Sequence, residues 1–132
     1  MGLTEEQMVA LARRTYERFN RGDLDAAVEV ADPSIVLVRV GDQGVVRGSE
    51  AVRAWMEPDA FESQAFDPLE FRVAGERVLI RGRVSTRGAG SGIEMELEAW
   101  TLWTFNEDGK VVRIENFLSH EEEAAVSALE GG

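Results

Sequence analysis

The chain has 132 residues, 44% of them hydrophobic, and its 25 acidic and 14 basic residues give a formal net charge of −11. A domain of this length can bury roughly two thirds of its unfolded surface, so these values exclude a disordered chain and argue against nucleic acid or anionic membranes as partners. With no cysteine and a single histidine, His120, the sequence predicts no thiolate or multi-histidine metal site, and we expect no metal ion and no cofactor.

The N-terminus predicts a helix rather than a targeting signal. The first residues, MGLTEEQ, lack a basic n-region and an apolar h-region, and no apolar run in the chain is long enough to span a membrane, which predicts a cytoplasmic protein. Thr4 and Gln7 have the spacing of a capping box. The residues that follow at helical spacing share one face: Met8, Ala12, Thr15, Tyr16 and Phe19.

A short helix, a strand and a third helix are predicted next. Asp23 caps the short helix and Pro33 closes it, because proline cannot continue the hydrogen-bond ladder. Residues 35–40, IVLVRV, have the nearly continuous apolar character of a strand covered on both faces. Ser49 then caps a third helix, which stops at Pro58.

The second half of the chain predicts an antiparallel sheet. After a predicted loop over residues 57–68, apolar and polar residues alternate through residues 70–119. A turn near Gly88–Gly92 joins a strand over residues 77–86 to a strand over residues 93–105. These strands and the one that follows them predict one continuous sheet.

Side-chain matching predicts the register of this sheet. Opposite charges meet if Arg83 lies opposite Glu96 and Arg81 lies opposite Glu98. Because side chains alternate between faces, the register also decides which residues share a face. The face that we expect to be concave and to lie under the helices carries Ile80, Val84, Leu97, Thr101, Trp103, Phe105, Ile114, Asn116 and Leu118.

Together these elements predict an α+β fold in a single domain over residues 1–132. The fold is a cone-shaped roll of N-terminal helices packed on a strongly curved antiparallel sheet, with a C-terminal helix that opens at the capping box Ser119-x-x-Glu122. The segments that carry a family resemblance are FNRGDLDAA, VVRGSEAVRAW, RGAGSGIEMELEAWTLWTF and GKVVRIENFLSHEEEAAVSAL. In this order they resemble the nuclear transport factor 2-like superfamily, and within it the SnoaL-like branch.

The resemblance implies a cystatin-like α+β roll, usually a homodimer, but it does not fix a chemistry. This fold hosts isomerases, cyclases, hydrolases, dehydratases and non-catalytic binding proteins. The general-base aspartate of the ketosteroid isomerases would fall near Val38 or Arg39, and their oxyanion-hole tyrosine near Thr15, one residue from Tyr16. The acid partner, or the histidine of many relatives, maps to Thr101. The catalytic carboxylates and histidine are therefore missing from the expected positions, and both the catalytic residues and the existence of an activity stay open.

Five residues are candidates for lining a ligand pocket: Tyr16, Trp55, Thr101, Trp103 and Asn116. Asn116 is an amide in an apolar strand, and it either hydrogen-bonds a ligand or satisfies buried backbone. The Tyr16 hydroxyl could polarise a carbonyl or lie at an ordinary rim. The two tryptophans line the cavity or belong to the core. The role of His120, beside the last capping box, is left open.

The opposite face of the sheet predicts an interface. Trp100, Leu102, Val111 and Phe117 would form an exposed apolar patch on a monomer, which favours a homodimer surface with a charged rim; the alternative is a patch that a loop covers.

Three functions are compatible with the sequence. The first is binding of a small apolar molecule with one or two polar groups in the central cavity. The second is a pocket enzyme, an isomerase, cyclase, hydratase or hydrolase, acting on a ketone-bearing or polyketide-like compound. The third is a dimeric interaction module without a ligand. The sequence identifies neither the ligand nor the pathway.

Overall fold

The computed structural model describes residues 2–41, 43–57, 61–88 and 93–131. In chain order the elements are α1 (Glu5–Asn20), α2 (Leu24–Val28), β1 (Ala31–Val38), β2 (Val45–Arg47), α3 (Ser49–Met56), β3 (Phe61–Ala74), β4 (Arg77–Gly88), β5 (Glu94–Phe105), β6 (Val111–Leu118), a 3₁₀ turn (Ser119–Glu121) and α4 (Glu122–Leu129). The strands form one sheet in the order β2-β1-β6-β5-β4-β3, in which β1 and β6 run parallel and the other neighbours antiparallel. The predicted α+β fold is confirmed.

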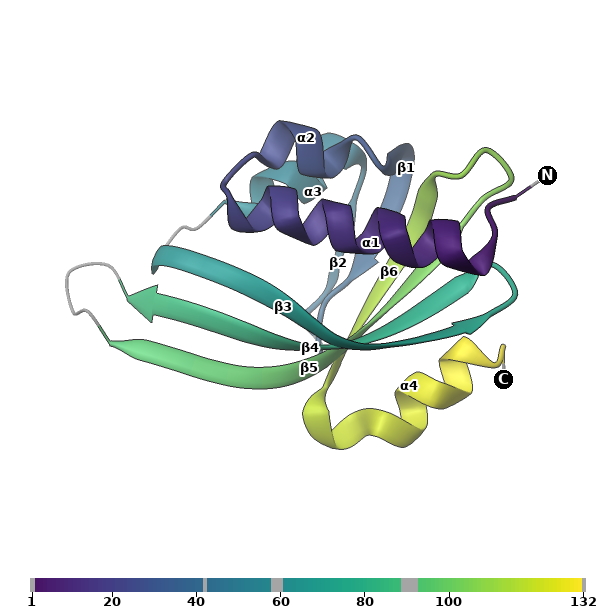
Figure 1. Cartoon of the computed structure of the whole chain (residues 1–132). Coiled ribbons are helices and arrows are strands. Elements are labelled where there is room, and N and C mark those ends of the chain that lie inside the picture. Colours follow the sequence, from purple (N-terminus) through teal and green to yellow (C-terminus); the bar gives the residue numbers. More distant parts are fainter. Residues whose placement is uncertain (1, 42, 58–60, 89–92, 132) are drawn as a thin grey trace.

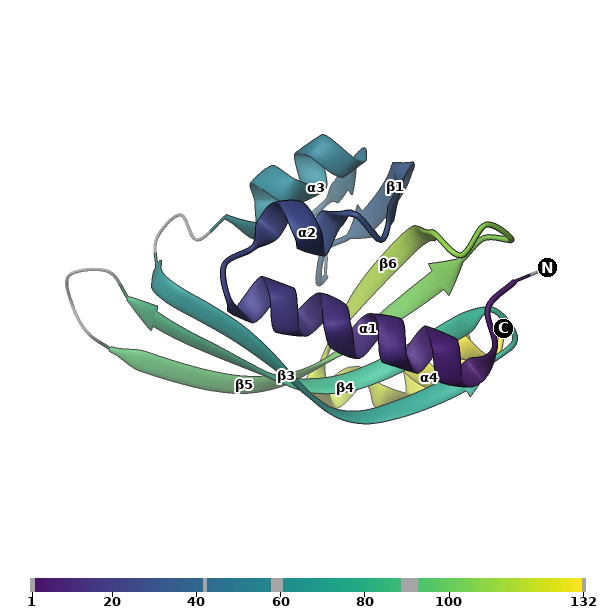
Figure 2. The same ribbon diagram turned by 45° about the horizontal axis from the view of Figure 1, so that its top comes forward.

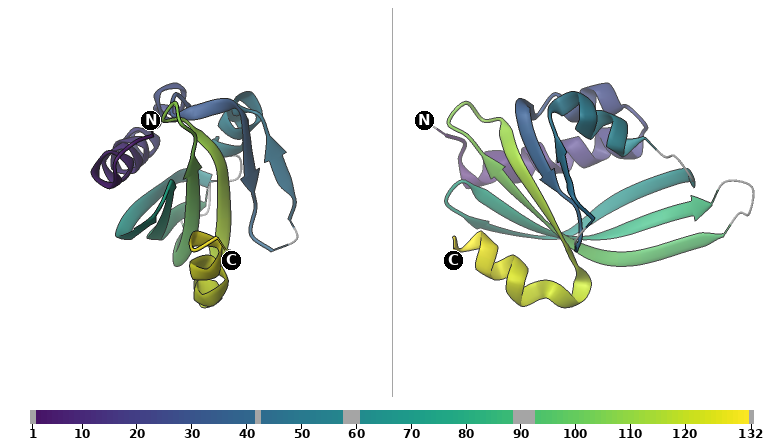
Figure 3. Two further views of the ribbon diagram at one scale, coloured as in Figure 1. Left: turned by 90° about the vertical axis from the view of Figure 1, so that its right-hand side faces the viewer. Right: turned by 180° about the vertical axis from the view of Figure 1, so that it is seen from behind.

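The helices lie on opposite sides of this sheet. In Figure 1 the helix α1 crosses above the long strands β3, β4 and β5, whereas α4 lies below them. Figure 2 shows α2 between α1 and α3, and these three helices cover one face of the sheet together. Seen from behind in Figure 3, α4 packs on the other face, where it contacts β4, β5 and β6. No helix in the described ranges is long and apolar enough to cross a membrane.

Both ends of α1 are fixed by side chains. The predicted capping box is confirmed: the Thr4 hydroxyl accepts from the Gln7 amide at 3.1 Å, and Gln7 Oε1 accepts from the Thr4 amide at 2.9 Å. At the other end, Asn20 Nδ2 donates to the Phe66 carbonyl at 2.9 Å and Asn20 Oδ1 accepts from the Phe66 amide at 2.8 Å. The Asn20 amide thus pairs with the free edge of β3 as a neighbouring strand would, which fixes α1 over the sheet.

Two predicted helix boundaries are wrong. The helix that Asp23 caps ends at Val28, and Pro33 instead lies inside β1, where the pairing with β6 is irregular. Proline is tolerated at such an irregularity because no ladder hydrogen bond is needed there. The N-cap of α3 is Gly48, with φ 92°, rather than Ser49, which forms the first residue of the helix. The predicted stop at Pro58 lies outside the described residues.

The loop predicted over residues 57–68 is largely a strand. β3 begins at Phe61 and pairs with β4 along its length. Pro68 hid this strand from sequence reasoning, because proline interrupts a strand pattern, yet it lies beside a bulge on the edge of the sheet. The chain then turns at residues 75–76 into β4, which contains the strand predicted over residues 77–86.

The predicted register between β4 and β5 is displaced by two residues. Arg83 lies opposite Glu98, and Arg81 lies opposite Trp100. Arg81 still forms an ion pair with Glu98 at 2.8 Å, diagonally across the strands. A shift of two keeps every side chain on its predicted face, so Thr101, Trp103 and Asn116 share the face under α1–α3 as predicted. The predicted turn at Gly88–Gly92 lies mostly outside the described residues.

The predicted exposed patch is wrong, because α4 covers it. Trp100 and Leu102 are 4% and 2% exposed, and they pack with Ala125 and Leu129 of α4 and, at the edge, with Phe117. Val111 lies in the core of the opposite face, because a bulge between Thr104 and Phe105 reverses the alternation there. The premise of the interface prediction therefore fails, and the homodimer itself stays a prediction.

The last helix begins differently from its prediction. Ser119–Glu121 forms a 3₁₀ turn before α4, and the Glu121 carboxylate accepts from the Leu118 amide at 2.8 Å. The donor group at the turn is thus satisfied by Glu121 and not by the predicted pair of Ser119 and Glu122.

Candidate functional site

A cavity of about 400 Å³ lies between the helices α1–α3 and the sheet. Its walls are mostly apolar and come from α1, α2, α3, β1, β3, β4, β5 and β6. The predicted pocket residues all lie in this lining: Tyr16, Trp55, Thr101, Trp103 and Asn116. The volume is within the range of roughly 300–1,000 Å³ in which small-molecule sites are found.

One polar cluster in the cavity wall joins α1 to β5, and Tyr16 of α1 lies at its centre. Trp103 Nε1 donates to the Tyr16 hydroxyl oxygen at 3.1 Å, and Thr101 also acts on this hydroxyl. Burial raises the pKa of Tyr16 well above its usual range, and the hydrogen bonds from Trp103 and Thr101 oppose this rise only in part. Tyr16 therefore keeps its proton, which it can donate to an acceptor in the cavity.

Aromatic packing holds Tyr16 in place. Its ring stacks on Phe66 of β3, with centroids 4.2 Å apart, and meets Trp103 at 5.4 Å. Phe66 in turn lies directly on the backbone of β4 at Gly82, where an added Cβ would come within 2.1 Å of the ring. Gly82 is therefore required for the close approach of Phe66, and through it for the position of Tyr16.

The Asn116 side chain satisfies a backbone group, which is one of the two alternatives that the sequence leaves open. Its Nδ2 donates to the Val38 carbonyl of the neighbouring strand β1 at 3.0 Å. Among the described residues no donor contacts Asn116 Oδ1. Because Asn116 lines the cavity, this oxygen is an acceptor available to a bound molecule.

Trp55 does not belong to the core. It is 44% exposed and lines the cavity from α3. Leu97 and Leu118, which are 49% and 38% exposed, line the cavity from the sheet. Large apolar side chains that face both solvent and the cavity mark its opening, which these residues border.

Arg39 was missed as a pocket residue. It follows β1 and lines the cavity together with Gln43 and Gln64. The one feature of the sequence that could have indicated this is the position of Arg39 in the apolar run IVLVRV. A charged side chain in a covered strand needs a partner that pairs with it or hydrogen-bonds to it. Sequence reasoning considered this position only as the site of a missing base.

His120 lies away from the cavity. It is exposed, at the 3₁₀ turn before α4, and faces a shallow outer hollow with Arg72 and Glu122. In the described part of the chain, no group of three or more His, Cys, Asp or Glu side chains could hold a metal ion. Neither Val38 nor Thr101, two of the positions at which the resemblance would place catalytic residues, carries a side chain that titrates near neutral pH.

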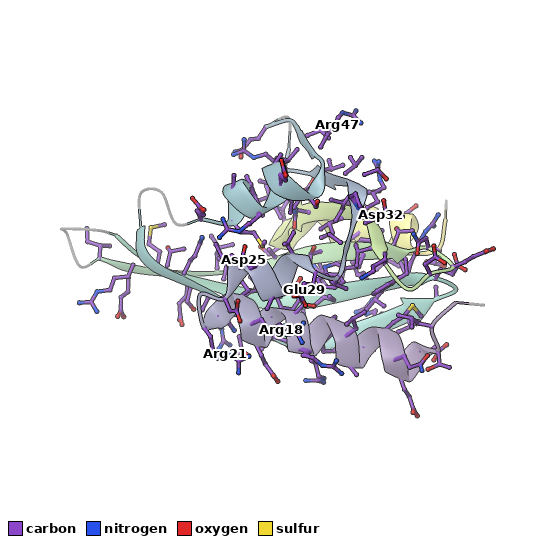
Figure 4. The ribbon with its side chains drawn as sticks, turned by 90° about the horizontal axis from the view of Figure 1, so that it is seen from above. Arg18, Arg21, Asp25, Glu29, Asp32 and Arg47 are labelled. Carbon is purple, nitrogen blue, oxygen red and sulfur yellow. The ribbon has the colours of Figure 1, made fainter. Side chains whose placement is uncertain are left out.

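Charged side chains lie instead on the outer surface of the helices and of the strands β1 and β2. Figure 4 looks down on this surface and labels Arg18, Arg21, Asp25, Glu29, Asp32 and Arg47. Asp25 forms an ion pair with Arg53 at 2.5 Å. Hydrogen bonds from Ser34 lower the pKa of Asp32. Asp25 and Asp32 therefore have their partners outside the cavity, and neither carboxylate belongs to its lining.

Comparisons with known proteins agree with this architecture. Residues 12–114 match the family model of the SnoaL-like domain. The chain is similar to SalBIII, an epoxide hydrolase/cyclase-like enzyme in pyran ring formation in polyether salinomycin, at 17% identity and a TM-score of 0.78 over 86% of this chain and 91% of that chain. It is also similar to a candidate SnoaL-like polyketide cyclase from Jannaschia sp. CCS1, at 21% identity and a TM-score of 0.75 over 97% and 94% of the two chains.

A third similar structure is an NTF2-like protein of unknown function from Burkholderia pseudomallei K96243, at 22% identity and a TM-score of 0.74 over 95% and 98% of the two chains. No curated protein matches the sequence. At these identities the likeness to the solved structures establishes the fold.

Proposed function

We propose that this chain, which belongs to the family of SnoaL-like domains, binds a small apolar molecule with one or two polar groups in its cavity. The observation that carries the proposal is the cavity itself: about 400 Å³ of space under the helices, with walls that are largely apolar. A packing defect of this size would be costly in a core, because cavities lose the contacts of the atoms that line them.

The polar groups of the cavity favour a ligand with a defined polar end. The Tyr16 hydroxyl can donate a hydrogen bond, and Asn116 Oδ1 can accept one. Both atoms are fixed by a second contact, Tyr16 by Trp103 and Asn116 by Val38. Fixed polar groups in an apolar pocket orient a ligand at little entropic cost.

A second candidate is an enzyme that acts on a ketone-bearing or polyketide-like compound. It is favoured by the neutral Tyr16 hydroxyl, which could polarise a ligand carbonyl, and by the names of the SalBIII and Jannaschia relatives. Binding is the stronger proposal, because a cavity that binds needs only the features above. Catalysis also requires a group that exchanges a proton near neutral pH.

The binding proposal is tested with a matched pair of ligands, naphthol and naphthalene. Isothermal titration at neutral pH should detect one bound molecule of either compound per chain. In Asn116→Leu the affinity for naphthol should fall about tenfold, because the hydroxyl loses its acceptor, whereas naphthalene should bind as before. Saturable binding of neither compound would contradict the proposal, and equal losses for both would contradict the role of Asn116.

A further inference from the structure

We infer that the bound molecule is an anion, an apolar carboxylate whose charged end is recognised by Arg39. The inference rests on the proposed function, since it names the class of ligand that the same cavity takes. Although the chain carries a net charge of −11, the one charged residue in the cavity lining, within the described ranges, is the cation Arg39.

The contacts of Arg39 leave most of its hydrogen-bonding capacity unused. Its Nη1 donates to the Gln43 carbonyl at 3.3 Å and its Nη2 donates to Gln43 Oε1 at 3.4 Å. Both acceptors are neutral and both distances are long for hydrogen bonds of this kind. A guanidinium has five N–H donors, so several remain for a ligand.

Arg39 lacks the carboxylate partner that several arginines of the outer surface have, as far as the described residues show. Arg53, Arg72, Arg81 and Arg113 each form an ion pair with a carboxylate at 2.5–2.8 Å. Among the described residues no carboxylate lies within ion-pair distance of Arg39. In so acidic a protein, an arginine that lines an apolar cavity and has no carboxylate partner among the described residues has its charge available for a bound anion.

The shape of the guanidinium selects the anion. Its planar fork of N–H donors matches the two oxygens of a carboxylate, which gives charge-assisted hydrogen bonds. The Gln43 contacts hold the side chain of Arg39 beside the hairpin between β1 and β2, where its backbone amide bonds to the Gly44 carbonyl at 3.0 Å. The guanidinium is thus held before the ligand enters, with a neutral amide as its support.

The electrostatics of the whole chain make this cation necessary for such a ligand. A net charge of −11 repels anions at long range, and an apolar cavity penalises a carboxylate that loses its water. A guanidinium at the wall offsets both effects locally. Without Arg39 the same cavity should prefer neutral molecules.

The test compares three naphthalene derivatives of nearly equal size at pH 7: naphthoate, naphthol and naphthylmethylammonium. Isothermal titration of the full chain should rank naphthoate first. In Arg39→Met the affinity for naphthoate should fall about tenfold, the effect of a charge-assisted hydrogen bond at a partly exposed site. The affinity for naphthol should stay within error of wild type, and the ammonium should bind better than before.

The matched control is Arg47→Met. Arg47 lies on β2, is exposed, lies outside the cavity lining, and its loss changes the net charge by the same amount. This variant should bind all three compounds like wild type. Equal affinity of wild type for naphthoate and naphthol, or an equal loss in Arg39→Met and Arg47→Met, would overturn the anion inference while leaving the cavity proposal intact. Binding of none of the three would overturn both.

Discussion

The two faces of the sheet carry two apolar clusters that are closed in different ways. On the face under α4, Leu79, Trp100 and Leu102 meet Ala125 and Leu129, and every one of these side chains is buried. On the face under α1–α3 the buried cluster continues into a cavity of about 400 Å³ that opens beside Trp55 and Leu97. The same strand, β5, supplies side chains to both clusters.

The elements that cover each face, rather than the strand itself, therefore determine which face of the sheet becomes a site. α4 is one short helix, and its buried side chains Ala125 and Leu129 belong to the same cluster as Trp100 and Leu102. The opposite cover is assembled from α1, α2 and α3, and α1 is held at β3 by Asn20, at the edge of the sheet rather than across its centre. Space is left between this cover and the strands.

The largest expected effect comes from shortening one leucine on each face of β5. Leu102→Ala should lower the free energy of unfolding by about 2–5 kcal/mol, because Leu102 is fully enclosed and its loss leaves a hole. Leu97→Ala should cost less than about 1 kcal/mol, because Leu97 borders the cavity and is half exposed. Urea unfolding of both variants measures the contrast; similar costs would show that the two faces are equally closed.

A smaller effect is expected from Gly82→Ala. The new methyl group would collide with the Phe66 ring, so the ring must leave its stack on Tyr16, at a cost of about 1–3 kcal/mol in unfolding free energy. The same substitution in a Phe66→Leu background should cost much less, because the ring is gone. If Gly82→Ala costs the same in both backgrounds, the contact with Phe66 does not explain the glycine.

The pKa of Tyr16 provides a test without a stability measurement. Tyr16 is the only tyrosine of the chain, and its burial raises its pKa above the ordinary value of about 10. Tyrosinate absorbance should therefore appear only well above pH 10, or together with alkaline unfolding. Tyr16→Phe is the control, since it should remove the signal and cost about 1 kcal/mol through the lost partner of Trp103.

The sign of the linked stability follows from that shift. The folded state binds the Tyr16 proton more tightly than the unfolded state, so this contribution is fully present below the unfolded pKa near 10. It is lost progressively as the pH rises above that value. An ordinary titration midpoint in the folded protein would contradict the buried position of the hydroxyl.

The smallest effect is expected at the end of α1. Asn20→Ala removes two hydrogen bonds to the backbone of Phe66 and should cost about 1 kcal/mol, because the site is exposed and water can replace the amide. Asn20→Asp, which keeps an acceptor for the Phe66 amide and loses the donor, should have an intermediate effect. Thermal unfolding compares the two variants, and an unchanged midpoint in both would show that this clamp does not hold α1.

Much of the cavity lining was predictable, because a register error of two residues leaves each side chain on the same face of the sheet. The predicted strand pairing was displaced, yet Thr101, Trp103 and Asn116 fell on the correct face, since a shift of two leaves alternation unchanged. Tyr16 followed from helical spacing on α1, whose capping box was also predicted. Alternation and spacing are local properties, and a single sequence contains them.

The sequence does not show in the same way which distant segment packs on each face of the sheet. Nothing in the local pattern shows that α4 folds back on Trp100 and Leu102, so the sequence predicts an interface on their face of the sheet. Pro68 hid the edge strand β3, and the bulge before Phe105 moved Val111 to the other face. Arg39 was missed because its significance depends on which acids lie near it in space.

Filling the cavity with a larger side chain tests directly whether a ligand binds there. Ala99 lines the cavity from β5, so Ala99→Trp should occupy the space that a ligand would take. We predict that wild type binds one molecule of naphthol per chain in isothermal titration and that the folded variant, checked by urea unfolding, gives no saturable heat. Equal affinity of wild type and Ala99→Trp would contradict the account, because the ligand would then bind outside the cavity.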